Sequence, residues 1–138
     1  MAKPRGNTAA EKNLYRVIDA NLNRAREGLR VIEDTSRFVL SRDDASENAR
    51  NLRHRLDFIT RKVYRQLLTE RDTASDPGRK NRETKHKNVS ALLGANFRRV
   101  EEALRVLEEY GRIISPLASA AIKSIRFKIY KLEKELLA

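Results

Sequence analysis

The stretch ANLNRAREGLRVIEDTSRFVL, residues 20–40, decides the fold, because the chain repeats it seventy-five positions later as ANFRRVEEALRVLEEYGRIIS, residues 95–115. Nine of the 21 aligned positions are identical, and they include Asn, Arg and Glu as well as Leu. A shared amphipathic pattern accounts for the leucines but not for these polar residues. At an offset of seventy-three, LRHRLDFITRKV (52–63) also aligns with IRFKIYKLEKEL (125–136). The repeated unit is therefore a helical hairpin.

Apolar residues recur at steps of three and four in four segments, a pattern typical of helices with one buried face. The first helix is expected to follow a capping box of Thr8 and Glu11 and to reach about Ser41. The second is expected to take its N-cap from the 43–46 turn and to end near Glu70. The third spans about 89–114, and the fourth follows Ser115 with proline at its first position. No segment alternates at period two, so no strands are expected.

Two such hairpins each leave an apolar face uncovered, and together they can bury both faces. We therefore predict an all-α fold, a four-helix bundle built from a duplicated helical hairpin with pseudo-two-fold symmetry. The expected domain is a single helical unit over residues 1–138. It divides into a first hairpin at about 9–70, a loop at 71–88 and a second hairpin at about 89–137.

In the first helix the buried stripe is expected to be centred on Leu29 and to include Ser36 and Val39. Gly28 borders the stripe and indicates a close helix crossing. Spacing also favours two surface ion pairs, because a glutamate four residues before an arginine is the preferred arrangement on a helix. The two expected surface pairs are Glu33 with Arg37 and Glu108 with Arg112.

The matched polar residues Arg24 and Glu27 lie nearly opposite the buried stripe, and Arg99 and Glu102 repeat them in the second copy. Each pair is set in a second apolar strip, made of Val17, Ala20, Val31 and Phe38 in the first copy and of Ala95, Val106 and Ile113 in the second. Such a face is typical of a dimer interface or of the wall of a polar pocket. The simplest interpretation of the four charged residues is a set of ion pairs on a half-buried face.

Composition narrows the class of protein. The chain has 138 residues, enough for one domain with a real core, and no cysteine, so disulfides, thiolate metal sites and cysteine nucleophiles are excluded. The start has no apolar run typical of a signal peptide, and no segment approaches the roughly 18 apolar residues of a membrane span. We expect a cytoplasmic protein without membrane association. The net charge of +11 favours anionic ligands without choosing among them.

Sequence motifs exclude the common nucleotide cradles, since neither GxxxxGK[ST] nor GxGxxG occurs. The two histidines, His54 and His86, are too sparse for a transition-metal site. The remaining candidate is the loop that begins RDTASDPG. In this loop Arg71 can pair with a phosphate, Asp72 and Asp76 can hold magnesium, and Gly78 lets the backbone approach an anion closely. A flexible basic linker would have a similar composition.

Four blocks, DANLNRAREGLRVIED, RNLRHRL, LLTERDTASDPG and ANFRRVEEALRVLEEYGR, occur in this order between Tyr15 and Arg112. Together they resemble the small helical domain that many bacteria fuse to thiamine-phosphate synthase and that also occurs alone as a monofunctional hydroxymethylpyrimidine-phosphate kinase. The loop differs from that family's pattern, which has Asp-Val-Gly where this chain has Asp76-Pro77-Gly78 and a very basic RKNRETKHK segment. Proline lacks an N–H, so that position cannot donate to phosphate.

The resemblance implies transfer of a phosphoryl group from ATP, with Mg²⁺, to hydroxymethylpyrimidine phosphate. The product is the pyrophosphate that thiamine-phosphate synthase uses. On this hypothesis the substrate pocket involves Asn21, Arg24 and Glu27 and their counterparts Asn96, Arg99 and Glu102. Either Glu27 or Glu102 orients the attacking oxygen, and the loop Arg71–Gly78 closes over phosphate. The two copies differ at several positions, which favours one asymmetric site per chain.

Two other functions compete with the kinase. One is a non-catalytic helical module that docks onto thiamine-phosphate synthase or forms a homodimer through the second apolar strip. The other is a nucleic-acid binder, suggested by basic residues on the second and fourth predicted helices: Arg50, Arg53, Arg61, Arg65, Lys123, Arg126, Lys128, Lys131 and Lys134. Solvated helix faces account for most of these, so nucleic acid is the least favoured partner.

Overall fold

The computed structural model describes residues 8–81, 83 and 85–138 and contains no strand among them. In chain order the elements are α1 (Ala9–Asp34) with a π-helical turn (Thr35–Val39), α2 (Asp43–Thr60), a 3₁₀ turn (Arg61–Val63), α3 (Tyr64–Glu70), a 3₁₀ turn (Pro77–Lys80), α4 (Val89–Ile114) and α5 (Pro116–Leu137). The expected all-α class is confirmed. None of the helices described is long and apolar enough to cross a membrane.

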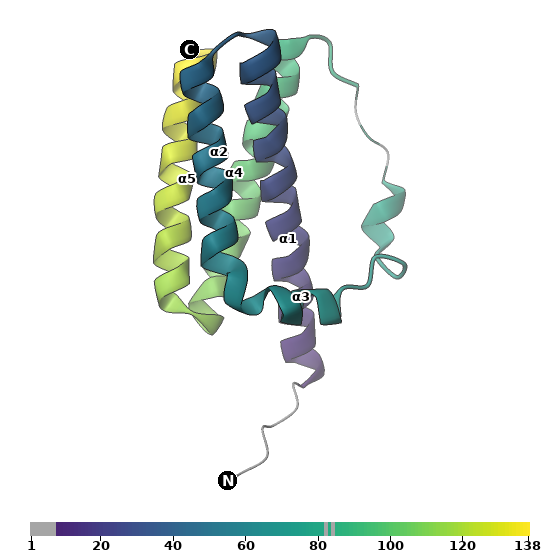
Figure 1. The fold of residues 1–138 in the computed structure, drawn as a ribbon. Coiled ribbons are helices and arrows are strands. Elements are labelled where there is room, and N and C mark those ends of the chain that lie inside the picture. The colour runs from purple at the N-terminus through teal and green to yellow at the C-terminus, as the bar shows by residue number, and fades with distance from the viewer. Residues whose placement is uncertain (1–7, 82, 84) are drawn as a thin grey trace.

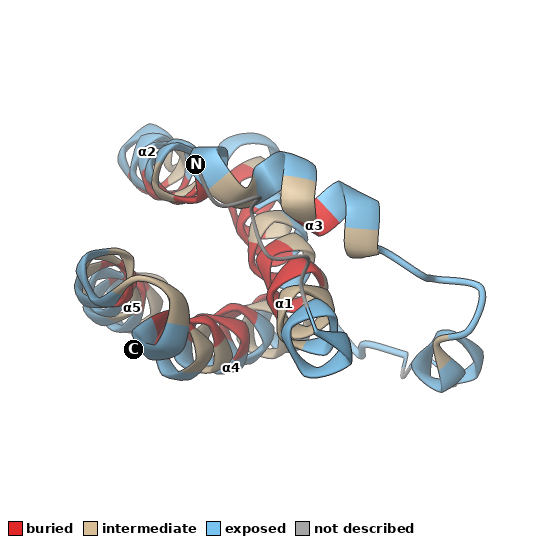
Figure 2. Cartoon of the chain, turned by 90° about the horizontal axis from the view of Figure 1, so that it is seen from below, coloured by how far each residue is buried: buried red, intermediate tan, exposed pale blue. Residues whose placement is uncertain are grey.

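The four long helices form a bundle in which every neighbouring pair is antiparallel (Figure 1). α1 packs against α2 and α4, and α5 packs against α4 and α2. The buried stretches of the helices lie toward the centre of the bundle, as Figure 2 shows. Phe97, Leu104 and Ile125 are among the residues fully removed from solvent there.

Two helix starts follow the predicted signals, and a third does not. Thr8 and Glu11 form the complete capping box, and the Ser115 side chain accepts from Ala118 N–H ahead of Pro116. The start of α2 is different, because its N-cap is Arg42 and no side chain caps it. The predicted caps in the 43–46 turn were wrong, since these residues already belong to the first turn of the helix.

The end of the first helix also departs from the prediction. Ser36 is fully buried as expected, but Val39 is 59 % exposed, so its place in the buried stripe was wrong. The cause is the π-helical turn Thr35–Val39, which inserts an extra residue into the turn. At about 100° per residue, this insertion rotates Val39 off the buried face.

The two glutamates expected on the surface are buried instead. Glu33 accepts two hydrogen bonds from Arg53 Nη2 on α2, both at 3.2 Å. Glu108 accepts from Arg126 on α5, at 2.5 Å from Nε and 3.2 Å from Nη2. The predicted surface pairs with Arg37 and Arg112 were wrong, because both glutamates border the buried stripe and face the next helix of their own hairpin.

The long loop has a topological cause. α2 and α4 run in the same direction, so the chain must return along the whole bundle between them (Figure 1). At 26 residues α4 is about 39 Å long, a distance that a short turn cannot span. Residues 71–88 make this crossover, and the break at Arg61–Val63 turns α3 against α1, where Leu67 is buried.

Candidate functional site

Two adjacent hollows lie where the crossover passes outside α1 and α4, and the crossover is well separated from the bundle in Figure 2. The α1 hollow, of about 910 Å³, is lined by nine of the α1 residues from Asn13 to Glu27, together with Arg71, Asp72, Thr73 and Asp76. The α4 hollow, of about 860 Å³, is lined by seven of the α4 residues from Ala95 to Val106, and by Gly78, Arg79, Asn81, Glu83 and His86. Asn21 and Arg24 line both hollows. Each volume falls within the range of small-molecule sites.

The two matched asparagines have the same local conformation. Asn21 donates from Nδ2 to Val17 O, and Asn96 donates to Leu92 O, both at 2.9 Å. Each side chain therefore bonds the carbonyl four residues earlier in its own helix, which leaves its carbonyl oxygen as an acceptor. Asn21 uses that oxygen for a long contact of 3.4 Å with Arg24 Nη1.

Of the four matched charged residues, only one pair meets. Arg99 Nη2 lies 3.5 Å from Glu27 Oε2, with both side chains more than half exposed. Arg24 and Glu102 line the α4 hollow without forming the corresponding pair, and within the described part of the chain Arg24 has no carboxylate within 4 Å. In the described part of the chain, the face is thus a polar wall with one weak ion pair, and Arg24 has no carboxylate partner there.

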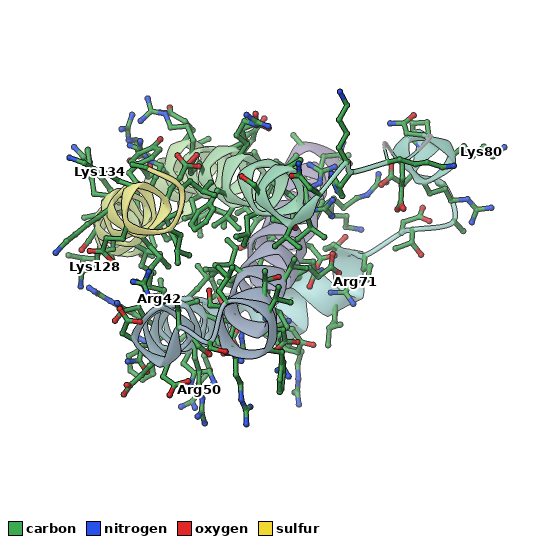
Figure 3. The ribbon with its side chains drawn as sticks, turned by 90° about the horizontal axis from the view of Figure 1, so that it is seen from above. Arg42, Arg50, Arg71, Lys80, Lys128 and Lys134 are labelled. Carbon is green, nitrogen blue, oxygen red and sulfur yellow. The ribbon has the colours of Figure 1, made fainter. Side chains whose placement is uncertain are left out.

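Arg71 is held by a residue that the sequence analysis missed. Asp19, which is 6 % exposed, accepts from Arg71 Nη2 at 2.6 Å and from Nε at 2.8 Å. Figure 3 shows Arg71 at the start of the crossover, whereas Lys80 lies at its far side. The bond to Asp19 raises the pKa of Arg71, and this pair fixes the crossover to α1. Three of the five guanidinium N–H groups remain for a ligand.

Asp72 and Asp76 both line the α1 hollow, and each already accepts one backbone hydrogen bond. Ser75 N–H donates to Asp72 Oδ1 at 3.0 Å, and Gly78 N–H donates to Asp76 Oδ1 at 2.8 Å. Hydrogen bonds from Ser75 also lower the pKa of Asp72. The Gly78 N–H expected to face an anion is therefore used within its own turn.

The two aspartates of the crossover, Asp72 and Asp76, are compatible with a bound magnesium ion. Within the described residues, no three acidic or histidine side chains lie close enough together to hold a metal ion by themselves. Mg²⁺ is commonly held by one or two carboxylates together with phosphate oxygens and water. The backbone hydrogen bonds reach only Oδ1 of each aspartate, so both carboxylates keep lone pairs that suit a metal arriving with a phosphorylated ligand.

Several lining residues had no motif to reveal them. Arg98 is the counterpart of Asn23 in the repeat, and the two occupy different hollows. Arg79 and His86 come from the basic segment of the crossover, which looked like a linker. The excess of positive charge in that segment was the available signal, but only the path of the crossover places it beside α4.

Glu101 has a shifted pKa outside both linings. Burial, together with the neighbouring Glu133 carboxylate on α5, raises the pKa of Glu101 to about 7. Its Oε2 is buried and has no hydrogen-bond partner among the residues that the structure describes. This carboxyl group therefore belongs to the contact between α4 and α5 and not to the hollows.

Together these features define a class of protein, a four-helix bundle whose long crossover passes beside two polar hollows. The ThiD2 family model matches residues 16–135, nearly the whole chain. The chain belongs to this family.

The matched relatives are longer proteins. The chain is 44 % identical over 127 residues to a thiamine-phosphate synthase of a Nostoc species, covering 90 % of this chain and 35 % of that protein. The thiamine-phosphate synthase of a Synechocystis species is 43 % identical over 134 residues, covering 94 % and 38 %. That of Rhodopirellula baltica is 37 % identical over 132 residues, covering 93 % and 35 %. The chain thus spans little more than a third of these relatives, and no solved structure matches it significantly.

Proposed function

We propose that this domain is a kinase of thiamine biosynthesis that transfers a phosphoryl group from ATP to hydroxymethylpyrimidine phosphate. The observation that carries the proposal is the pair of hollows around Asn21 and Arg24, where the polar residues of both repeat copies gather. The names of the relatives support the pathway, because a thiamine-phosphate synthase consumes the pyrophosphate that this reaction would make. The unpaired charge of Arg24 supports an anionic ligand.

The proposed reaction needs neutralisation of charge more than proton transfer. An oxygen of the substrate phosphate attacks the γ-phosphorus of ATP, the bond between that phosphorus and the bridging oxygen breaks, and ADP leaves. Because the second pKa of a phosphate monoester is about 6, the attacking oxygen is already ionised near neutral pH. The barrier comes from bringing two anions together, which arginines and Mg²⁺ lower by neutralising their charge.

The residues divide the proposed work as follows. Arg24 and Arg99 neutralise phosphate oxygens, while Asn21 and Asn96 offer amide oxygens to a ligand amino group or a bound water. Glu27 holds Arg99, so its role in orienting the attacking oxygen would be exerted through that guanidinium. Glu102 is the other carboxylate proposed to orient that oxygen, from the α4 hollow. Mg²⁺ on Asp72 and Asp76 would neutralise phosphate charge, and Arg71 would contact phosphate at the same end.

The test is conversion of the pyrimidine monophosphate by purified protein with ATP and Mg²⁺, with the pyrophosphate product detected directly. Arg24→Ala and Arg99→Ala are expected to lower kcat/KM by roughly 10- to 100-fold, the effect of losing a charged hydrogen bond. Arg50→Ala, an exposed change on α2 outside both hollows, is the matched control. Unchanged turnover in both hollow variants would remove the pocket assignment.

A second candidate is a non-catalytic module that associates with thiamine-phosphate synthase. It is favoured by the relatives, in which the matching segment is about a third of a longer synthase chain. It is also favoured by large apolar side chains left on the surface, such as Phe58 at 71 % and Leu117 at 86 % exposure, which suit a synthase or a second copy of the chain. Absence of turnover together with a tight complex with a synthase would select this function.

The duplicated hairpin with pseudo-two-fold symmetry also remains our proposal. The buried pairs Glu33–Arg53 and Glu108–Arg126 support it, because both the glutamates and the arginines occupy corresponding positions in the two alignments. The equal conformations of Asn21 and Asn96 support it as well. Superposing α1–α2 on α4–α5 in an experimental structure tests the symmetry directly.

A further inference from the structure

The two hollows differ in charge although their walls come from corresponding parts of the repeat. Four arginines and two glutamates line the α4 hollow: Arg24, Arg79, Arg98, Arg99, Glu83 and Glu102. Three arginines and four acidic residues line the α1 hollow: Arg16, Arg24, Arg71, Asp19, Glu27, Asp72 and Asp76. The α4 hollow is therefore cationic, and it also contains His86.

The arginines of the two hollows also differ in their availability. In the α1 hollow Arg71 is held by two short bonds to Asp19. In the α4 hollow Arg79 and Arg98 have no carboxylate within 4 Å among the residues that the structure describes, and Arg99 has only its 3.5 Å contact with Glu27. The α4 hollow is therefore lined by several guanidinium groups with few carboxylate partners among the described residues, which suits a ligand with several phosphate oxygens.

Divergence between the repeats matches this difference. Asn21, Arg24 and Glu27 line the α1 hollow, and their counterparts at 96, 99 and 102 line the α4 hollow. A fourth pair of corresponding positions differs, because Asn23 lines the α1 hollow whereas Arg98 lines the α4 hollow. Asn23 donates to Asp19 at 3.3 Å and keeps a free amide oxygen, whereas Arg98 adds a cation.

We propose that the hollows are two distinct subsites. The α4 hollow takes the polyphosphate of the nucleotide through Arg79, Arg98 and Arg99. The α1 hollow takes the pyrimidine phosphate with the metal. Asn21 and Arg24, the only residues common to both described linings, lie where the phosphoryl group passes between the ligands. This assignment rests on the proposed kinase function and adds Arg79 and Arg98 to its site.

The test measures binding of each ligand separately by titration calorimetry of the full chain. The probes, each titrated in the presence of Mg²⁺, are the β,γ-imido analogue of ATP, inorganic tripolyphosphate and hydroxymethylpyrimidine phosphate. Arg79→Gln and Arg98→Gln are expected to weaken both polyphosphate probes roughly tenfold or more each, and to leave pyrimidine phosphate affinity within about twofold. Asp72→Asn is expected to weaken binding of the pyrimidine phosphate and to leave the affinity for both polyphosphate probes within about twofold. Lys123→Gln, an exposed change on α5, is the matched control and should alter no affinity.

The outcomes separate this inference from the kinase proposal. The subsite assignment is overturned, and the kinase proposal kept, if the wild type turns over substrate while Arg98→Gln binds the ATP analogue unchanged. The same conclusion follows if Arg98→Gln loses affinity for the pyrimidine phosphate instead. Binding of both probes as assigned, without turnover, supports the subsites and removes the kinase. If the wild-type chain binds neither the ATP analogue nor the pyrimidine phosphate, both the subsite assignment and the kinase proposal are overturned. Thermal melting of each variant confirms that these exposed arginines are not needed for folding.

Discussion

The buried ion pair of the second hairpin predicts a large and specific loss of stability. In Arg126→Met the two hydrogen bonds to Glu108 disappear, and a carboxylate whose side chain is 1 % exposed stays in the core. Within the described residues the other cation within 4 Å is Arg105, at 3.7 Å and half exposed, which compensates poorly. Leaving one partner of a buried pair uncompensated costs about 3–5 kcal/mol of unfolding free energy.

Urea unfolding followed by circular dichroism measures this loss. With a slope near 2 kcal/mol per molar, typical for this size, the midpoint should fall by about 2 M. The double variant Glu108→Leu with Arg126→Met removes both charges and should recover most of the loss. Lys123→Met, exposed on the same helix, is the control and should stay within about 0.5 kcal/mol of the wild type.

The first hairpin offers an internal comparison. Arg53→Met should lose less, because Arg30 Nε lies 3.3 Å from Glu33 and keeps part of the compensation. The reasoning would be refuted by an Arg126→Met variant within 1 kcal/mol of the wild type. A double variant no more stable than the single one would also refute it, since the loss would then not come from the stranded carboxylate.

Three further changes test other parts of the fold. Gly28→Ala places a Cβ 2.6 Å from the stiff side chain of Val100 and should lower the unfolding free energy by about 1–3 kcal/mol. Its control is Gly94→Ala, whose Cβ meets nothing closer than 4.0 Å and which should be neutral or stabilising. Equal changes of the urea unfolding midpoint in the two variants would contradict this reasoning. Because the pKa of Glu101 is raised in the folded chain, its ionisation destabilises the fold increasingly as pH rises from about 4.5 to about 7. Glu101→Gln should therefore raise the unfolding free energy by about 1 kcal/mol at pH 8, after allowance for solvent screening. At pH 4.5 the same variant should give no gain. Asp19→Asn removes the charged partner that fixes the crossover, so limited trypsin digestion should cleave the crossover faster; unchanged cleavage would show that other contacts fix it.

The helices were predictable because each signal is local. Capping hydroxyls, a proline at the first position and the three-and-four apolar spacing all act within a few residues, so the bounds of α4 and the start of α5 agree with the prediction. The errors occurred where distant packing overrides the local pattern. The π-helical turn at Thr35–Val39 and the break at Arg61–Val63 change the direction of the chain without any glycine or proline to mark them.

The site was predictable in part for the same reason. Repeated polar residues such as Asn21 and Asn96 stood out because the bundle does not require them, and the structure brings them to one wall. The partner of Arg71 could not be found, because Asp19 lies 52 positions away and has a glycine at the corresponding place in the second copy. The net charge also did not show that Arg53 and Arg126 form ion pairs with buried glutamates.

The sequence by itself determined the all-α class, the positions of the long helices and the repeated Asn, Arg and Glu, because periodicity and self-similarity are properties of the chain alone. Only the tertiary structure decided what these residues surround. Since α2 and α4 run in the same direction, the connection between them must travel the length of the bundle. That path carries a basic segment, from Arg71 to His86, across α1 and α4, and it turns two helix faces into the walls of two hollows.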